Sequence, residues 1–349
     1  MLNFDKTKKV LVTGGSGYLA SWIIKMLLDE GVNVNTTVRD SLNIEKTAHL
    51  KAFDKNRQLR IFKADLLDSG SYKEAMEGCD FVVHTASPFF ISGFKDPEKE
   101  LIKPAKQGTQ NVLNTAKQMP DIKRVVLTSS VVAIYGDTID IQKTSNNIFT
   151  ENEWNETSSV NHNPYSFSKT VAEKEAWKIA KSQNQWDLVV INPGWILGPS
   201  LSKRKDSFSI KTMIEFGNGT YRTGVPKIFV GVVDVRDVAK AHINACFLPE
   251  AKGRHIIVSK TMSFMDIADI IRKHFKNKYP LPSIIVPKPI FWLIAPFLGF
   301  TRKYVTKNVG QEIYYDNSYS IDNLKLNYRH VEETIIEHFQ QILDDGLLT

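Results

Sequence analysis

The chain has 349 residues, of which 42% are hydrophobic and 24% charged, a balance that suits one full globular domain and a smaller one. Its formal net charge is +7, but Lys and Arg are spread along the chain and form no basic runs interleaved with aromatic residues, so no nucleic-acid partner is expected. The two cysteines, Cys79 and Cys246, form no CxxC or Cys/His cluster. We therefore expect no metal site and a reducing, cytoplasmic location. No signal peptide is expected either, because residues 1–15 contain no apolar core of signal-peptide length before the first predicted strand.

A glycine-rich turn near the N-terminus carries the first strong signal. Lys9–Thr13 predicts a buried parallel strand, and residues 18–31 predict an amphipathic helix. The pattern Gly14-x-x-Gly17-x-x-Ala20 lies between them, in the context that a dinucleotide-binding turn requires. Its glycines permit a tight turn and close approach to a pyrophosphate, which the helix N-terminus then binds. The candidate cofactor-binding residues here are Gly14, Ser16, Gly17, Tyr18 and Leu19.

The second predicted strand, Val32–Val38, ends at a cation. Arg39 follows it directly, where an NAD site usually carries an acidic residue for the ribose hydroxyl. Arg39 suits the 2′-phosphate of NADP, and Lys46 is close enough in sequence to reach the same phosphate. Asp40 keeps NAD open as the less favoured cofactor.

The next two strands, Leu59–Phe62 and Asp80–His84, add candidates at their carboxyl ends. Asp65 can accept a hydrogen bond from an adenine amino group; the alternative is that it caps the next helix, a role that suits Asp68 or Ser69 better. His84 has no carboxylate partner in sight, so we interpret it as a packed structural residue. Small side chains after it leave room for a ribose and nicotinamide. The candidates from these two strand ends are Asp65, Leu66, Thr85, Ala86 and Ser87.

The residues with catalytic potential follow the fifth strand, Arg124–Thr128. Ser129 and Ser130 come at its carboxyl edge, where a hydroxyl can bind a substrate carbonyl. Tyr165 and Lys169 begin a predicted helix and are one turn apart, so they share a face. A cation near a phenol favours the phenolate, and a phenol tuned in this way can exchange a proton with an alcohol oxygen.

The remainder of the chain is less regular. The polar stretch 137–163 is too long for a simple connector and is a candidate substrate wall. Trp186–Ile191 predicts a sixth strand, and beyond it the strand–helix alternation ends. We expect a cofactor domain over 1–195 and a mainly substrate-binding domain over 196–349, with part of 225–260 returning to the first sheet.

One apolar stretch, Ser283–Phe300, contains three prolines and Lys288. These interruptions argue against a helix that spans a bilayer. A helix packed near the substrate pocket or at an interface is the favoured interpretation, and a peripheral membrane contact is the alternative.

Taken together, seven motifs resemble the extended short-chain dehydrogenase/reductase family across nearly the whole chain, in the family's order and at compatible spacing. Within that family, the chain is most similar to the branch of dihydroflavonol reductases, cinnamoyl-CoA reductases and yeast-type aldehyde or methylglyoxal reductases. It has an Arg directly after the second strand and a Lys seven residues later, as this branch does. The motifs are TGGSGYLA (13–20), ADLLD (64–68), VVHTAS (82–87), VVLTSS (125–130), YSFSK (165–169), NPGWILGP (192–199) and VDVRDVA (233–239).

The resemblance implies an α/β fold, a Rossmann-type doubly wound parallel sheet with a smaller, mostly helical C-terminal substrate domain. It also implies reduction of an aldehyde or ketone by NADPH, or the reverse oxidation. By position, Tyr165 is the acid/base, and Lys169 lowers its pKa and binds the nicotinamide ribose. Ser130 holds the carbonyl oxygen, with Ser129 the alternative within the doublet. Pro193 lines the nicotinamide.

Two departures narrow the substrate. Plant dihydroflavonol reductases place a flavonoid-binding Asn where this chain has Tyr135, which counts against a flavonoid. Nucleotide-sugar dehydratases carry an Asp-Glu pair after the corresponding Ser or Thr, and this chain has Val-Val after Ser130. Asn111 corresponds to a helix Asn that supports a water relay in related enzymes, although the extended branch differs there.

The expected partner is a small carbonyl substrate, and the protein is expected to be a monomer or homodimer. The alternatives on the same scaffold are a nucleotide-sugar epimerase, a sterol-type dehydrogenase or a non-enzymatic NADP-binding protein.

Overall fold

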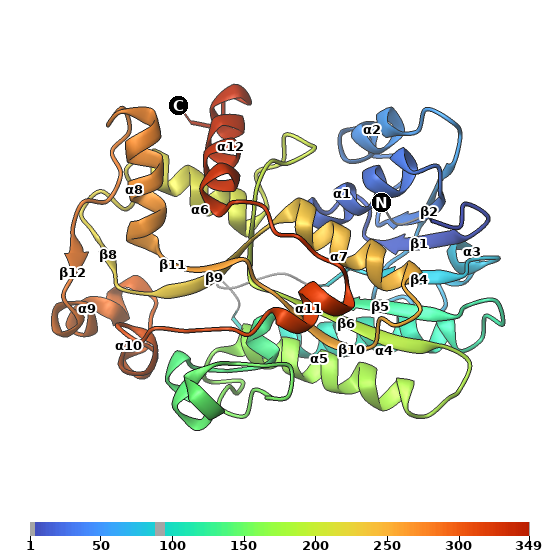
Figure 1. The fold of residues 1–349 in the computed structure, drawn as a ribbon, viewed down its shortest axis with the longest axis horizontal. Helices are drawn as coiled ribbons and strands as arrows, with labels where there is room; N and C mark the ends of the chain where they lie inside the picture. Colours follow the sequence, from blue (N-terminus) through green and yellow to red (C-terminus); the bar gives the residue numbers. More distant parts are fainter. Residues whose placement is uncertain (1–3, 88–94, 349) are drawn as a thin grey trace.

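The computed structural model describes residues 4–87 and 95–348, which are organised around a parallel sheet of seven strands (Figure 1). The strand order is β10-β6-β5-β4-β1-β2-β3, and every pair is parallel. The strands are β1 (Lys9–Thr13), β2 (Asn33–Val38), β3 (Leu59–Lys63), β4 (Phe81–His84), β5 (Arg124–Thr128), β6 (Asp187–Pro193) and β10 (Gly253–Ile257).

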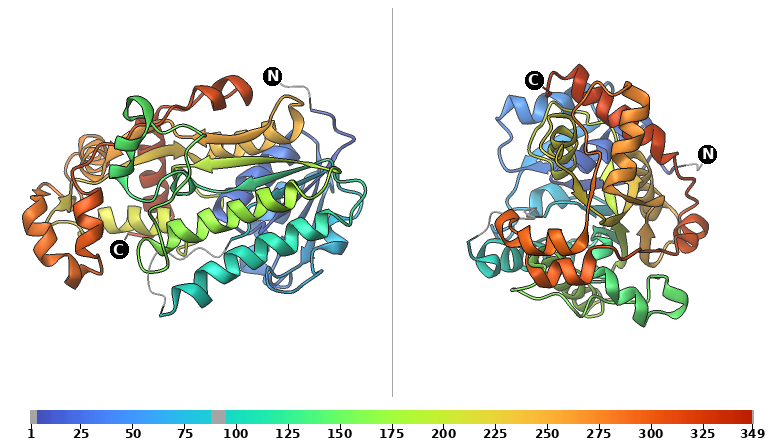
Figure 2. Two further views of the ribbon diagram at one scale, coloured as in Figure 1. Left: turned by 90° about the horizontal axis from the view of Figure 1, so that it is seen from below. Right: turned by 90° about the vertical axis from the view of Figure 1, so that its left-hand side faces the viewer.

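Helices cover both faces of this sheet because its strands are apolar on both sides. Val10 and Val12 of β1 face one core, which the first, second and seventh helices complete, whereas Leu11 faces the other. In the second core the fourth and fifth helices lie side by side (Figure 2). The helices of this half are α1 (Tyr18–Asp29), α2 (Ile44–Phe53), α3 (Lys73–Met76), α4 (Lys103–Ala116), α5 (Pro164–Ala180) and α7 (Val235–Phe247).

The predicted doubly wound sheet is therefore confirmed, and the first six strands lie where the sequence indicates. The largest extension is at β6, which continues through Pro193 because β10 pairs with it up to that residue. The seventh strand, β10, follows α7 and completes the sheet at the β6 edge.

The other half of the molecule is built from helices around two small sheets, which the sequence pattern does not predict. Its main core contains Phe216, Ile271 and Phe339, which come from three different helices. The small sheets consist of β7 (Trp195–Leu197), β9 (Phe229–Asp234) and β11 (Lys260–Ser263), and of β8 (Val225–Pro226) and β12 (Ile285–Val286). The helices of this half are α6 (Phe208–Gly217), α8 (Phe264–Phe275), α9 (Lys288–Ile294), α10 (Arg302–Asn308) and α12 (Val331–Asp344). Helix α11 (Ser318–Asn323) instead contacts β10 of the large sheet.

Hydrogen bonds fasten the two halves together close to the glycine turn. The Tyr18 hydroxyl donates to the carbonyl oxygen of Gly198 at 2.5 Å, and the Trp22 indole donates to that of Pro199 at 2.7 Å. Across residues 4–87 and 95–348, every helix is too short or too polar to span a bilayer.

Candidate active site

The glycine turn between β1 and α1 is shaped for close backbone approach. Gly14 has a φ of 70°, and a Cβ there would lie 3.1 Å from Cβ of Ala86. Gly15, which the fingerprint pattern leaves open, is equally constrained because a Cβ would overlap Oγ1 of Thr36. Gly17 precedes α1, and no side chain caps the helix there. The first-turn N–H groups thus form a cradle that fits a pyrophosphate.

A cation that sequence analysis missed lies against this turn. Arg204 donates from its guanidinium to the carbonyl oxygen of Ser16 at 2.9 Å and pairs with Asp206 at 2.7 Å. Its loop has no periodic pattern, and no motif marks Arg204. The Tyr18 hydroxyl donates to the carbonyl oxygen of Gly198 and is therefore engaged within the protein. The groups of Tyr18 and Leu19 that remain suited to a phosphate are their backbone N–H groups.

The predicted 2′-phosphate site lies at the end of β2. The side chains of Arg39 and Lys46 are exposed. Arg39 forms no hydrogen bond or ion pair with another described residue, whereas the charge of Lys46 interacts with that of Asp206. Asp40, the residue that favoured NAD, accepts a hydrogen bond from the backbone N–H of Leu42 at 3.0 Å. One of its oxygens is thus engaged in a local turn, while the two cations keep their charge available for a phosphate.

The turn after β3 is held from a neighbouring helix. Asn111 of α4 donates to the carbonyl oxygens of Leu66 at 3.2 Å and Asp68 at 2.7 Å, and it accepts from Gly70 N–H at 3.1 Å. Its amide is therefore committed to the turn and not to a water relay. Asp65 is exposed there, with one carboxylate oxygen accepting from Leu67 N–H at 2.9 Å.

The segment after β4 brings two predicted residues, Thr85 and Ala86, to the end of β1 beside the glycine turn. Thr85 donates to the carbonyl oxygen of Thr13 at 2.5 Å, and Ala86 N–H donates to the Thr13 hydroxyl at 3.1 Å. His84 is buried against the same hydroxyl at 2.9 Å, and burial lowers its pKa to about 3. The histidine is therefore neutral and structural, as its sequence context indicates.

Helix α5 delivers the predicted catalytic pair to this edge of the sheet. Tyr165 lies in its first turn, and Lys169 donates from Nζ to Ser87 Oγ at 3.2 Å. Burial lowers the pKa of Lys169 to about 8, partly offset by Glu173. Burial also raises the pKa of Tyr165 above its ordinary value. Burial is the cause of this rise, and the expectation that the Lys169 ammonium lowers the pKa of Tyr165 stays a prediction.

The two serines after β5 have different surroundings. Ser129 is buried and donates to Glu173 at 2.5 Å. Ser130 is only partly buried, and its hydroxyl makes two long hydrogen bonds, to the carbonyl oxygen of Pro193 at 3.4 Å and from Val132 N–H at 3.3 Å. Ser130 therefore has a hydroxyl that can be recruited by a ligand, whereas the Ser129 hydroxyl is already engaged.

A buried carboxylate on α5 was not predicted from the sequence. Glu173 follows Lys169 by one helical turn and pairs with Arg254 of β10 at 2.6 Å, and Asn192 donates to it at 2.8 Å. The Arg254 guanidinium lies 3.9 Å from the Trp154 ring centroid. The spacing from Lys169 could have indicated that Glu173 shares its face, but the partner on β10 is not visible in the sequence.

The stretch 137–163 is ordered around a second buried carboxylate. Asp137 accepts from His162 at 2.8 Å, from Asn163 at 3.1 Å and from Asn308 of α10 at 2.8 Å. Asn163 is the residue immediately before α5, so this cluster fixes where the catalytic helix begins. The Tyr135 hydroxyl is also engaged, because Tyr315 donates to it at 2.9 Å.

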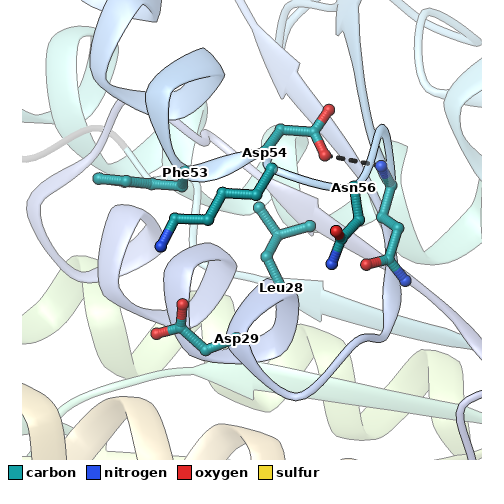
Figure 3. Close-up of a pocket in the computed structure, with 7 residues that line it drawn as sticks. Leu28, Asp29, Phe53, Asp54 and Asn56 are labelled. Atoms are coloured by element: carbon teal, nitrogen blue, oxygen red, sulfur yellow. Dashed lines mark hydrogen bonds between the residues drawn. The ribbon is translucent and has the colours of Figure 1, made fainter.

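A small polar pocket elsewhere is remote from this chemistry (Figure 3). It lies where α1 and α2 end, at the amino edge of β2 and β3, whereas the glycine turn is at the carboxyl edge. The labelled residues of the pocket are Leu28, Asp29, Phe53, Asp54 and Asn56.

Within the described chain, no three His, Cys, Asp or Glu side chains lie close enough together to form a metal site.

Known proteins are similar to this chain in sequence and in fold. A cinnamoyl-CoA reductase of Medicago truncatula is 39% identical over 284 residues, which cover 80% of this chain and 82% of the relative. A tetraketide alpha-pyrone reductase of Arabidopsis thaliana is 34% identical over 99% of this chain and 98% of its own. The structure of yeast methylglyoxal/isovaleraldehyde reductase complexed with NADPH superposes with a TM-score of 0.80 at 26% identity, covering 98% of this chain and 100% of that one.

A family model gives the same result. Residues 11–264, which run from β1 to the start of α8, match the 3-beta hydroxysteroid dehydrogenase/isomerase family. The matched region contains the glycine turn, both serines and the Tyr165–Lys169 pair. The chain therefore belongs to the 3-beta hydroxysteroid dehydrogenase/isomerase family, within the extended short-chain dehydrogenases/reductases.

Proposed function

We propose that this protein uses NADPH to reduce an aldehyde or ketone to an alcohol. The observation that carries the proposal is the 3.2 Å contact between Lys169 of α5 and Ser87, next to the glycine turn. It brings the cation of the Tyr165 helix to the edge of the sheet where a dinucleotide binds in folds of this kind. The relatives named as reductases, and the solved neighbours complexed with NADPH, support the same activity.

Each side chain then has a distinct task. NADPH supplies the hydride that adds to the carbonyl carbon. The hydroxyls of Ser130 and Tyr165 donate hydrogen bonds to the carbonyl oxygen and position it. As negative charge develops on that oxygen, Tyr165 transfers its proton and becomes a phenolate, which the Lys169 ammonium stabilises. The phenol of Tyr165 is protonated at neutral pH, so it can act as the proton donor in this direction.

The cofactor preference rests on the end of β2. Arg39 and Lys46 offer two exposed cations, which favours a 2′-phosphate over a free ribose hydroxyl. Solved neighbours from Candida albicans, at 29% identity, and from yeast hold NADPH, which supports the same preference.

The direct test is a substrate screen followed by the absorbance of the reduced cofactor. Aliphatic aldehydes, aromatic aldehydes, diketones and ketosteroids should be offered with NADPH and with NADH. We expect turnover of at least one carbonyl class and faster turnover with NADPH. A purified protein that carries bound NAD and oxidises neither reduced cofactor with any carbonyl would contradict the proposal and favour a nucleotide-sugar epimerase.

A further inference from the structure

The segment 284–300 exposes an unusual share of large apolar side chains. Eight of the fourteen large apolar side chains that are exposed in the described part of the chain lie in this short segment. Phe297 is 90% exposed, and the five others named below are 40–58% exposed. We call these six side chains the tip patch: Ile290, Leu293, Ile294, Phe297, Leu298 and Phe300.

The helix beneath the tip patch is apolar on both sides. Phe291 and Ala295 point inward, into a small core with Val305 and Val309. The tip-patch residues from Ile290 to Leu298 follow the spacing i, i+3, i+4, i+7 and i+8, which places them on the other side of α9 and the 3₁₀ turn after it. A helix that is apolar all round normally has a second apolar or lipid environment.

The sequence around the tip patch carries charge of one sign, with Arg272 and Lys307 paired to Asp269 and Asp137. No Asp or Glu occurs between Asp269 and Glu312, whereas this interval contains eight of the 45 Lys and Arg residues. Outside the interval, 37 cations face 38 anions, so the net positive charge of the chain originates here. Lys288, Arg302 and Lys303 belong to the two helices of the tip itself, α9 and α10.

The tip patch also lies at one end of the long axis of the molecule, with α9 and α10 projecting from the half opposite α1 and α2 (Figures 1 and 2). A flat surface can therefore approach it without meeting the sheet. A second copy of the chain is a poor occupant, because two such ends would oppose cations to cations. An anionic surface with an apolar interior matches both the charge and the apolar side chains.

We propose that the α9–α10 tip docks on the surface of an anionic phospholipid bilayer, with the tip patch inserted at the boundary between headgroups and acyl chains. Phe297 and Leu293 provide apolar burial, and Lys288, Arg302 and Lys303 contact the acidic headgroups. The protein lies on the membrane in this arrangement and does not span it.

The test is flotation of the full chain with vesicles of phosphatidylcholine alone and of phosphatidylcholine mixed with phosphatidylglycerol. We expect association with the anionic vesicles only, and its loss at high salt because screening weakens headgroup attraction. Phe297→Ser should weaken that association by at least about tenfold. Lys303→Glu should weaken it by about fivefold or more.

Leu42→Ser is the matched control, because Leu42 is 87% exposed and lies outside the tip patch. It should bind anionic vesicles like the unmodified chain, and sedimentation should show that all variants are folded. No association with anionic vesicles, or association that Phe297→Ser and Leu42→Ser affect equally, would overturn the proposal. A dimer that Phe297→Ser abolishes, in a chain that ignores vesicles, would assign the patch to a second copy instead.

Discussion

The charge of Lys169 depends on pH within the ordinary assay range. Because burial lowers its pKa to about 8, the ammonium is present below that pH and is lost above it. If the ammonium binds the cofactor ribose, the Kd for NADPH should stay constant below about pH 8 and rise above it. The measurement is a fluorescence titration of NADPH across this range. The variant Lys169→Met should bind more weakly and show no such rise; an identical pH profile in both proteins would contradict the assignment.

The serine doublet allows a paired comparison of neighbours. Ser130→Ala removes the hydroxyl assigned to the carbonyl oxygen and should lower kcat/KM for the carbonyl by about a hundredfold. Ser129→Ala removes a hydrogen bond to Glu173 instead, so it should cost about 1 kcal/mol in the free energy of unfolding and leave kcat/KM within about threefold. Steady-state kinetics of both variants decide the point. The reverse order of effects would transfer the role to Ser129.

A substitution at Glu173 measures how much the buried ion pair between α5 and Arg254 contributes to stability. In Glu173→Gln, Arg254 loses its carboxylate partner in a buried site, so the free energy of unfolding should fall by about 3 kcal/mol. Glu175→Gln is the control on the same helix. Its ion pair with Lys106 is 3.6 Å long and the Lys106 side chain is 45% exposed, so the substitution should change stability by less than about 1 kcal/mol. Urea unfolding measures both. Equal changes would mean that the Arg254 pair contributes little.

Among the elements, α10 is linked by hydrogen bonds to the residues that precede α5. Asn308 donates to Asp137 at 2.8 Å and accepts from Thr138 N–H at 2.8 Å. Asn308→Ala leaves these buried groups unpaired, so it should lower the free energy of unfolding by about 2 kcal/mol and raise the KM for the carbonyl. Thr306→Ala, which removes an exposed hydroxyl of the same helix, should change stability by less than about 0.5 kcal/mol. If both variants behave alike in thermal unfolding and kinetics, the Asn308–Asp137 contact does not hold α5.

The elements also show which features a sequence reveals. The glycine turn with its flanking strand and helix is local, so its residues predict it directly, and the same holds for the Tyr165–Lys169 spacing. By contrast, Arg204 contacts Ser16 across 188 residues and Asn308 contacts Asp137 across 171. The Arg254–Glu173 pair joins residues 81 apart. No local pattern specifies such pairings, since the partners meet only after the sheet and the second half have folded.

At the scale of the whole molecule, the glycine turn lies where the two halves meet. Tyr18 and Trp22 bind the chain that leaves the large sheet, and Arg204 returns to Ser16. The residues proposed to bind NADPH come from the half with the large sheet, and Arg204 is a cation of the second half that contacts their glycine turn. The α9–α10 tip lies at the end of the molecule opposite α1 and α2 (Figure 1), and Asn308 of α10 links it to Asp137 near the start of α5.

The most direct test of the proposed mechanism is the variant Tyr165→Phe, studied by turnover and by NADPH binding in parallel. The substitution removes the phenolic oxygen and leaves the aromatic ring in the first turn of α5. We expect kcat for carbonyl reduction to fall by at least about a hundredfold, because no other assigned group donates the proton, while the Kd for NADPH changes by less than about threefold. A kcat equal to that of the unmodified enzyme would contradict the account.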